Sequence, residues 1–111
     1  MADFIGANVA DVTLVKQSDV VIKKVIATAA TVNLPEGTEA LKPGQVLISI
    51  DNGATFDVAQ VDDEANGILC EPLKATGPAE VLLIGVVREK YLTGLDATHK
   101  PHLFANKIIL K

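Results

Sequence analysis

His99 and His102 are the residues whose spacing most suggests metal chemistry. They lie three positions apart with Pro101 between them, and neutral imidazoles are common metal ligands. A zinc site requires three or four ligands from the protein or solvent. The single cysteine, Cys70, lies far away along the chain in an apolar stretch. We therefore expect two solvated loop histidines and no metal site.

Asp62, Glu64 and the pair Asn66-Gly67 match the opening of an EF-hand calcium loop. The twelfth position of such a loop must supply a bidentate carboxylate, and Leu73 occupies that position here. The coordination sphere cannot close, so we interpret this acidic stretch as a solvated turn.

Nucleophilic catalysis would need a serine or cysteine beside a base. The two serines, Ser18 and Ser49, lie in no strained turn motif, and the residues before Cys70 indicate a buried thiol. No glycine-rich phosphate loop is present. The sequence therefore predicts a protein that is not an enzyme and that uses no cofactor or small-molecule substrate.

Composition narrows the class of protein further. A chain of 111 residues fits one domain, and a hydrophobic content of 49% with only 4% aromatic residues predicts an aliphatic, sheet-rich core. The net charge of −4 argues against a nucleic-acid partner. No apolar run is long enough for a membrane helix, and the N-terminus lacks the basic region of a secretory signal. We expect a protein made in the cytoplasm without a membrane partner.

The sequence predicts that the main secondary-structure elements of the chain are β-strands. Pro43-Gly44 predicts a type II turn that feeds a strand ending at Ile50, and Asp51-Asn52-Gly53 predicts the hairpin that pairs it with residues 56–61. The apolar run 81–87 predicts a central strand, with a bulge or close backbone approach at Gly85.

Two further regions complete the predicted sheet. Residues 107–111 predict a last strand, and residues 12–31 predict two short strands. Lys23 and Lys24 interrupt that earlier region as charges do on an exposed edge. The fold class that follows is mainly β (α+β with little helix), a small compact β-domain with a flexible N-terminal arm.

The N-terminal residues follow neither a helical nor a strand period. We assign residues 1–14 to an arm and residues 15–111 to the β-rich domain. Phe4 and Ile5 are costly to leave in water, which favours an arm that docks on a partner.

From Val32 onward, the order of these signals resembles the lambda-type head decoration proteins of tailed bacteriophages. The residues that carry the resemblance are the stretch 41–47, the strand at Phe56-Asp57-Val58, the acidic loop leading to residues 67–69, the apolar run reaching Gly85 with its charged exit Arg88-Glu89, and the terminal stretch 103–111. The resemblance covers about seventy percent of the chain, as residues 32–111.

The resemblance implies a mostly β capsid decoration, or cement, protein that forms a homotrimer. Such trimers bind the outside of the expanded head at threefold sites, clamp the major capsid protein and stabilise the shell against internal DNA pressure. The N-terminal arm of that family adds a strand to a capsid-protein sheet. By this resemblance the mature location is the outer surface of the virion. The capsid-binding residues are expected to be Ala2, Asp3, Phe4, Ile5, Gly6, Ala7 and Asn8.

Two points stay open at the level of sequence. The β-branched segment 12–26 is longer than the arm of lambda's own protein, which leaves open where the arm ends. The stretch 41–47 is also similar to the second hairpin of biotinyl and lipoyl carrier domains, although the tip Asp51-Asn52-Gly53 lacks the lysine that such domains modify. A barrel-sandwich carrier or binding module is therefore the alternative function.

Overall fold

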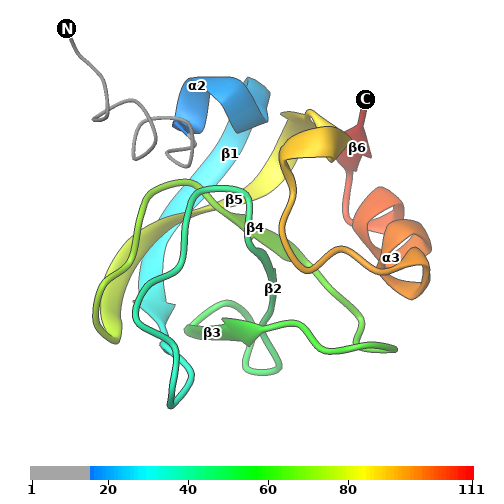
Figure 1. The fold of residues 1–111 in the computed structure, drawn as a ribbon. Helices are drawn as coiled ribbons and strands as arrows, with labels where there is room; N and C mark the ends of the chain where they lie inside the picture. The colour runs from blue at the N-terminus through cyan, green and yellow to red at the C-terminus, as the bar shows by residue number, and fades with distance from the viewer. Residues whose placement is uncertain (1–15) are drawn as a thin grey trace, which may run out of the picture.

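The computed structural model describes residues 16–111, which form a mainly β fold (Figure 1). This fold class confirms the prediction from sequence. The elements in chain order are α2 (Gln17–Val20), β1 (Val21–Val32), β2 (Val46–Ile48), β3 (Thr55–Val58), β4 (Gly67–Leu69), β5 (Gly77–Val87), the 3-10 turns η1 (Glu89–Tyr91) and η2 (Ala97–His99), α3 (Lys100–Ala105) and β6 (Ile108–Leu110).

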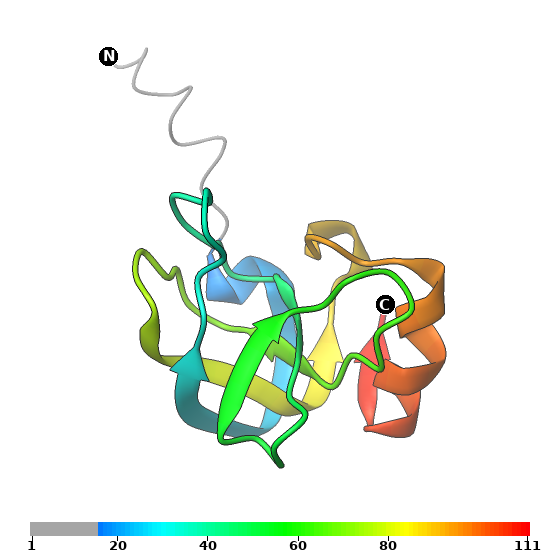
Figure 2. The same ribbon diagram turned by 90° about the horizontal axis from the view of Figure 1, so that it is seen from below.

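Five of the strands close into a small barrel. The strand order is β1-β3-β2-β4-β5, and β5 also pairs with β1, which completes the ring. β6 adds to β5 in parallel outside the ring, and α3 lies beside it at one end of the molecule (Figure 2). The apolar run 81–87 is therefore central, as predicted, because β5 pairs with β1, β4 and β6.

The predicted hairpin between β2 and β3 is confirmed. Leu47 pairs with Val58 and Ile48 with Asp57, in antiparallel register. Asn52 and Gly53 both adopt a positive φ, as the hairpin signal requires. Before β2, Gly44 has a φ of +101°, and a side chain there would meet the backbone oxygen of Tyr91. The turn at Pro43-Gly44 thus requires glycine for both its conformation and its packing.

Of the two short strands predicted within residues 12–31, the first, at residues 12–15, lies outside the described residues, and the second was predicted too short. The described part of that region is a single helical turn, α2, followed by β1, one strand of 12 residues. β1 pairs with β5 over its whole length, with register shifts between Val21 and Ala27 that let it bend around the barrel. Gly85 makes this possible, since a Cβ atom there would clash with the carbonyl oxygen of Lys23. The expected close approach at Gly85 is confirmed.

Two apolar clusters lie on opposite faces of the sheet. Neighbouring residues such as Ile68 and Leu69 belong to different clusters, because successive side chains of a strand point to opposite faces. One cluster surrounds Phe56 inside the barrel, and the other is covered by Leu103 of α3 and Ile108 of β6. Full burial of one large apolar side chain, such as Leu, Ile or Phe, stabilises the folded state by roughly 1.5–3 kcal/mol.

Candidate interaction surfaces

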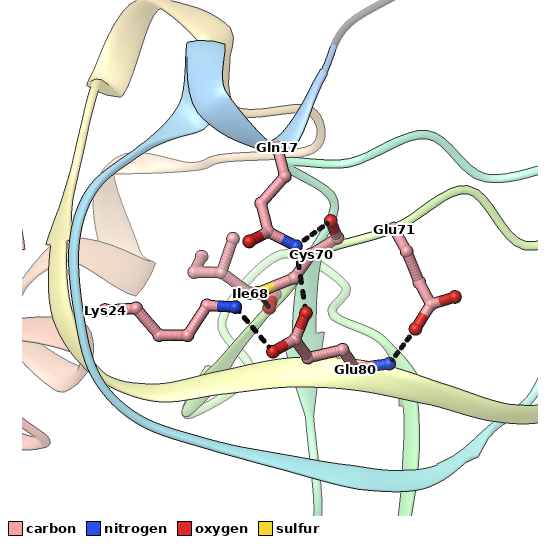
Figure 3. A network of polar contacts seen from close by, with 6 residues as sticks. All are labelled: Gln17, Lys24, Ile68, Cys70, Glu71 and Glu80. Atoms are coloured by element: carbon pink, nitrogen blue, oxygen red, sulfur yellow. Dashed lines mark hydrogen bonds and ion pairs between the residues drawn. The ribbon is translucent and has the colours of Figure 1, made fainter.

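Cys70 lies in a polar network that fastens α2 to the barrel (Figure 3). Gln17 Nε2 donates to the carbonyl oxygen of Cys70 and to Glu80 Oε1, both at 2.9 Å. Lys24 Nζ forms an ion pair of 2.7 Å with Glu80 Oε2, and the backbone N–H of Glu80 donates to Glu71 Oε2 at 2.6 Å. Because α2 begins at Gln17, the network anchors the first described element of the chain to the barrel.

The electrostatics of this network are those of a structural support. The hydrogen bond from Lys24 holds the pKa of the Glu80 carboxyl below its usual value, and the same bond raises the pKa of Lys24. Burial raises the pKa of the Cys70 thiol to about 11. The thiol is therefore protonated at neutral pH and is a poor nucleophile. The expected buried thiol is confirmed.

The expectation of two solvated histidines was wrong for His99. Its side chain is completely buried, its Nδ1 accepts from the backbone N–H of Asp96 at 3.0 Å, and its Nε2 lies 2.6 Å from the carbonyl oxygen of Gln60. Since a backbone N–H can only donate, Nε2 carries the proton and donates to Gln60. Buried rings need such partners, so His99 ties η2 to the loop after β3. Within residues 16–111, no group of three His, Cys, Asp or Glu residues could hold a metal ion.

The acidic loop is largely a structural turn. Asp63 Oδ2 accepts from the backbone N–H of Gln60 at 2.7 Å, and the side chain of Asn66 bonds both the N–H and the carbonyl oxygen of Ser49. Ser49 Oγ in turn donates to Asp51 Oδ1 at 2.9 Å. The Ser49 hydroxyl thus lies against a carboxylate that organises the hairpin.

Asp51 is the organising carboxylate of the β2–β3 hairpin. It accepts hydrogen bonds from the hydroxyl and the backbone N–H of Thr55, at 2.6 and 2.9 Å. These bonds, the hydroxyl bond first, lower the pKa of Asp51 to about 2.

The first half of β1 is an unusual surface. Five successive residues, 22–26, are exposed, although they belong to a paired strand. β5 occupies one edge of this half, whereas β3 pairs only with Thr31 and Val32. Among the described strands, none pairs with the other edge of this half. Lys23 and Lys24 lie on this exposed edge as the sequence predicted.

Large apolar side chains are exposed in three places on the described surface. One is the first half of β1, and the others are the hairpin and loop around β3 and the end of α3. The side chains and their exposed fractions are Ile22 44%, Val25 54%, Ile26 48%, Ile50 89%, Val61 66% and Phe104 69%. A pair of lysines in a β-branched run signalled the first place, but nothing in the sequence distinguishes Ile50 or Phe104 from core residues.

The structure does not describe the predicted arm, residues 1–14. The predicted capsid-binding residues Ala2, Asp3, Phe4, Ile5, Gly6, Ala7 and Asn8 therefore lie outside the described residues.

No helix in the described part of the chain is long and apolar enough to cross a membrane. No protein-family model, curated protein or solved structure matches this chain.

Proposed function

We propose that this protein is a decoration protein of a tailed bacteriophage head. It binds the outside of the expanded capsid as a homotrimer at threefold sites, contacts the major capsid protein and stabilises the shell against the pressure of packaged DNA. Its location is the outer surface of the virion. The order of motifs described above supports the family, and the mainly β fold agrees with it.

The observation that carries the proposal is the exposed first half of β1. This segment begins at Val21, seven positions after the last residue of the predicted arm, 1–14, and α2 is anchored to the barrel by Gln17. A strand edge that pairs with none of the described strands and carries exposed Ile22, Val25 and Ile26 offers main-chain hydrogen bonds and apolar contacts to a partner sheet. This edge is a second capsid contact in addition to the predicted arm.

Binding by several weak contacts suits this role. Strand addition needs main-chain hydrogen bonds more than exact side chains, and alternate side chains such as Phe4 can fill pockets on the partner. Three arms on one trimer raise the effective concentration of each after the first has bound. The trimer therefore attaches more tightly than any single arm would.

Co-sedimentation with expanded heads that lack the protein tests the proposal. We expect saturable binding of the full chain and weaker binding of a chain that begins at residue 15. Phe4→Ser/Ile5→Ser should weaken binding, whereas Glu36→Ser/Glu39→Ser, two exposed polar positions outside the arm, should not. Binding that survives truncation would place the contact on the folded body instead of the arm. Absence of binding to the expanded heads of the phage that encodes the protein would contradict the proposal.

A further inference from the structure

The loop after β3 and the end of β2 form an acidic face with exposed apolar side chains. We define it by Ile50, Val61, Asp57, Asp62, Asp63 and Glu64. Two shallow hollows on this face share Ile48, Ile50 and Asp63, and their lining contains four carboxylates but no lysine or arginine. In Figure 1 the loop runs from β3 to the region below α3, where the N–H of Asp62 donates to Thr98 Oγ1.

A second face has the opposite charge. We define this basic face by Phe104, Ile109, Leu110, Lys100, Lys107 and Lys111. A groove of about 280 Å³ beside β6 and α3 is lined by Phe104, Ile109 and Leu110 and by one residue of each charge, Lys100 and Glu89, which pair at 2.9 Å. The excess positive charge of the face comes from Lys107 and Lys111, which flank β6 in the chain, are exposed and pair with no carboxylate in the described part of the chain.

We propose that these two faces bind each other between copies of this chain. The acidic face of one protomer contacts the basic face of the next, with Phe104 of one copy against Ile50 and Val61 of its neighbour. Charge complementarity selects a second copy as the occupant, since the same chain carries both signs, each beside exposed apolar side chains. The inference rests on the proposed function, because it assigns the contact that forms the homotrimer.

A contact between two different faces can build a closed ring. The ring closes when the rotation from each copy to the next adds up to one full turn. A hollow of about 370 Å³ is lined by Ile50 of the acidic face and by Asn106, which lies between Phe104 and Lys107 of the basic face in the chain. We take this hollow as the edge between the two faces. In a threefold ring, the edge where both contact faces meet points toward the axis.

The chemistry of this edge fits a position near a symmetry axis. Its lining includes Ser49, Asn52, Asn66 and Asn106 with Leu83 and Ile84, and no charged residue. A charge at the axis would face its own copies and repel them. The exposed side chain of Asn52 can instead bond across the axis in either direction, because its amide both donates and accepts.

Charge reversal measured by sedimentation equilibrium tests this contact. Asp62 and Glu64 are exposed, and their carboxylates form no ion pair or hydrogen bond among the described residues. We expect the full chain to form trimers, and Asp62→Lys/Glu64→Lys or Lys107→Glu/Lys111→Glu to weaken trimerisation by at least about tenfold at low salt. Mixing the two variants should not restore a homogeneous trimer, whereas combining all four changes in one chain should restore it.

Matched variants separate this contact from a general effect of charge. Glu36→Lys/Glu39→Lys and Lys42→Glu/Lys74→Glu make the same charge changes at exposed positions outside both faces and should leave trimerisation unchanged. Thermal unfolding of every variant shows whether the fold is intact. A full chain that stays monomeric, or trimers that resist both reversals, would overturn the inference.

The same proteins added to expanded heads distinguish this inference from the proposed function. Binding to heads by a chain whose trimerisation resists both reversals would overturn the contact and keep the decoration role. Trimers that dissociate on reversal but never bind heads would keep the contact and overturn the decoration role.

Discussion

The buried interior of the domain and its exposed surface differ in the side chains they contain. In the interior, the polar side chains have partners: His99 bonds Asp96 and Gln60, and Gln45 bonds backbone oxygens of Val46 and Thr93. Outside, large apolar side chains such as Ile50 and Phe104 are left in water. The buried polar side chains thus find their partners within one chain. Exposed apolar side chains of this size are typical of surfaces that contact other proteins.

This difference leads to two classes of substitution. Changes in the interior should lower the free energy of unfolding, and changes at the exposed apolar side chains should lower association while unfolding stays nearly constant.

Phe56→Ala should produce the largest loss of stability. Phe56 is 1% exposed and packs inside the barrel, so its removal leaves a cavity. We expect a loss of about 3–5 kcal/mol in the free energy of unfolding, measured by urea denaturation. The matched surface variant Phe104→Ala should change it by less than about 0.5 kcal/mol. Similar losses for both would contradict the division.

His99→Ala should be next in size. The substitution removes a fully buried ring and leaves the N–H of Asp96 and the carbonyl oxygen of Gln60 without their partner. We expect a loss of about 2–4 kcal/mol, again from urea denaturation. His102→Ala is the control, because that side chain is only half-buried, and its expected loss is below about 1 kcal/mol. If His99→Ala lowered the free energy of unfolding no more than His102→Ala does, the buried ring of His99 would have no structural role.

Gly44→Ala tests the turn that begins β2. The positive φ and the clash with the carbonyl oxygen of Tyr91 both oppose a side chain, and we expect a loss of about 2 kcal/mol. Gly37→Ala is a matched control, since its φ is also positive but no atom lies within 4 Å of an added Cβ. Thermal unfolding should therefore show a larger fall in Tm for Gly44→Ala than for Gly37→Ala.

Asp51→Asn should have the smallest effect, and the effect should depend on pH. The pKa of Asp51 is about 2 in the folded chain and 3.8 ordinarily, so the carboxylate stabilises the fold above about pH 4. That contribution is lost as the pH falls from 4 to 2. We expect the Tm of the unsubstituted chain to fall more steeply over this window than that of Asp51→Asn, with Glu39→Gln as a control for removing one carboxylate. If the Tm of both proteins fell equally between pH 4 and pH 2, the hydrogen bonds assigned to the Asp51 carboxylate would be contradicted.

Local signals predicted much of the fold, because they act over a few residues. Pro43-Gly44, Asp51-Asn52-Gly53 and the apolar run 81–87 all led to the observed turn, hairpin and central strand. The single long strand β1 was not predictable in this way. Its continuity depends on pairing with β5, which is distant in sequence, and that pairing carries residues 28–31 into the sheet despite their weak local pattern.

The exposed apolar surfaces could not be predicted from the sequence, because exposure depends on the tertiary fold. Exposure of Ile50, Val61 and Phe104 is decided by which faces the barrel closes, and the local pattern around each residue resembles that of a core residue. His99 shows the reverse case, since a polar residue in a loop became buried through partners on another element. Lys23 and Lys24 were informative because a charge inside a strand directly opposes burial.

Electron cryo-microscopy of expanded heads incubated with the purified protein would show directly whether and where the protein binds the capsid. The heads should come from the phage that encodes the protein and should lack it beforehand. The decoration role predicts added density on the outer surface at threefold and quasi-threefold positions, with three barrels around each axis. Heads that show no added density, or density only on the inner surface, would contradict that role.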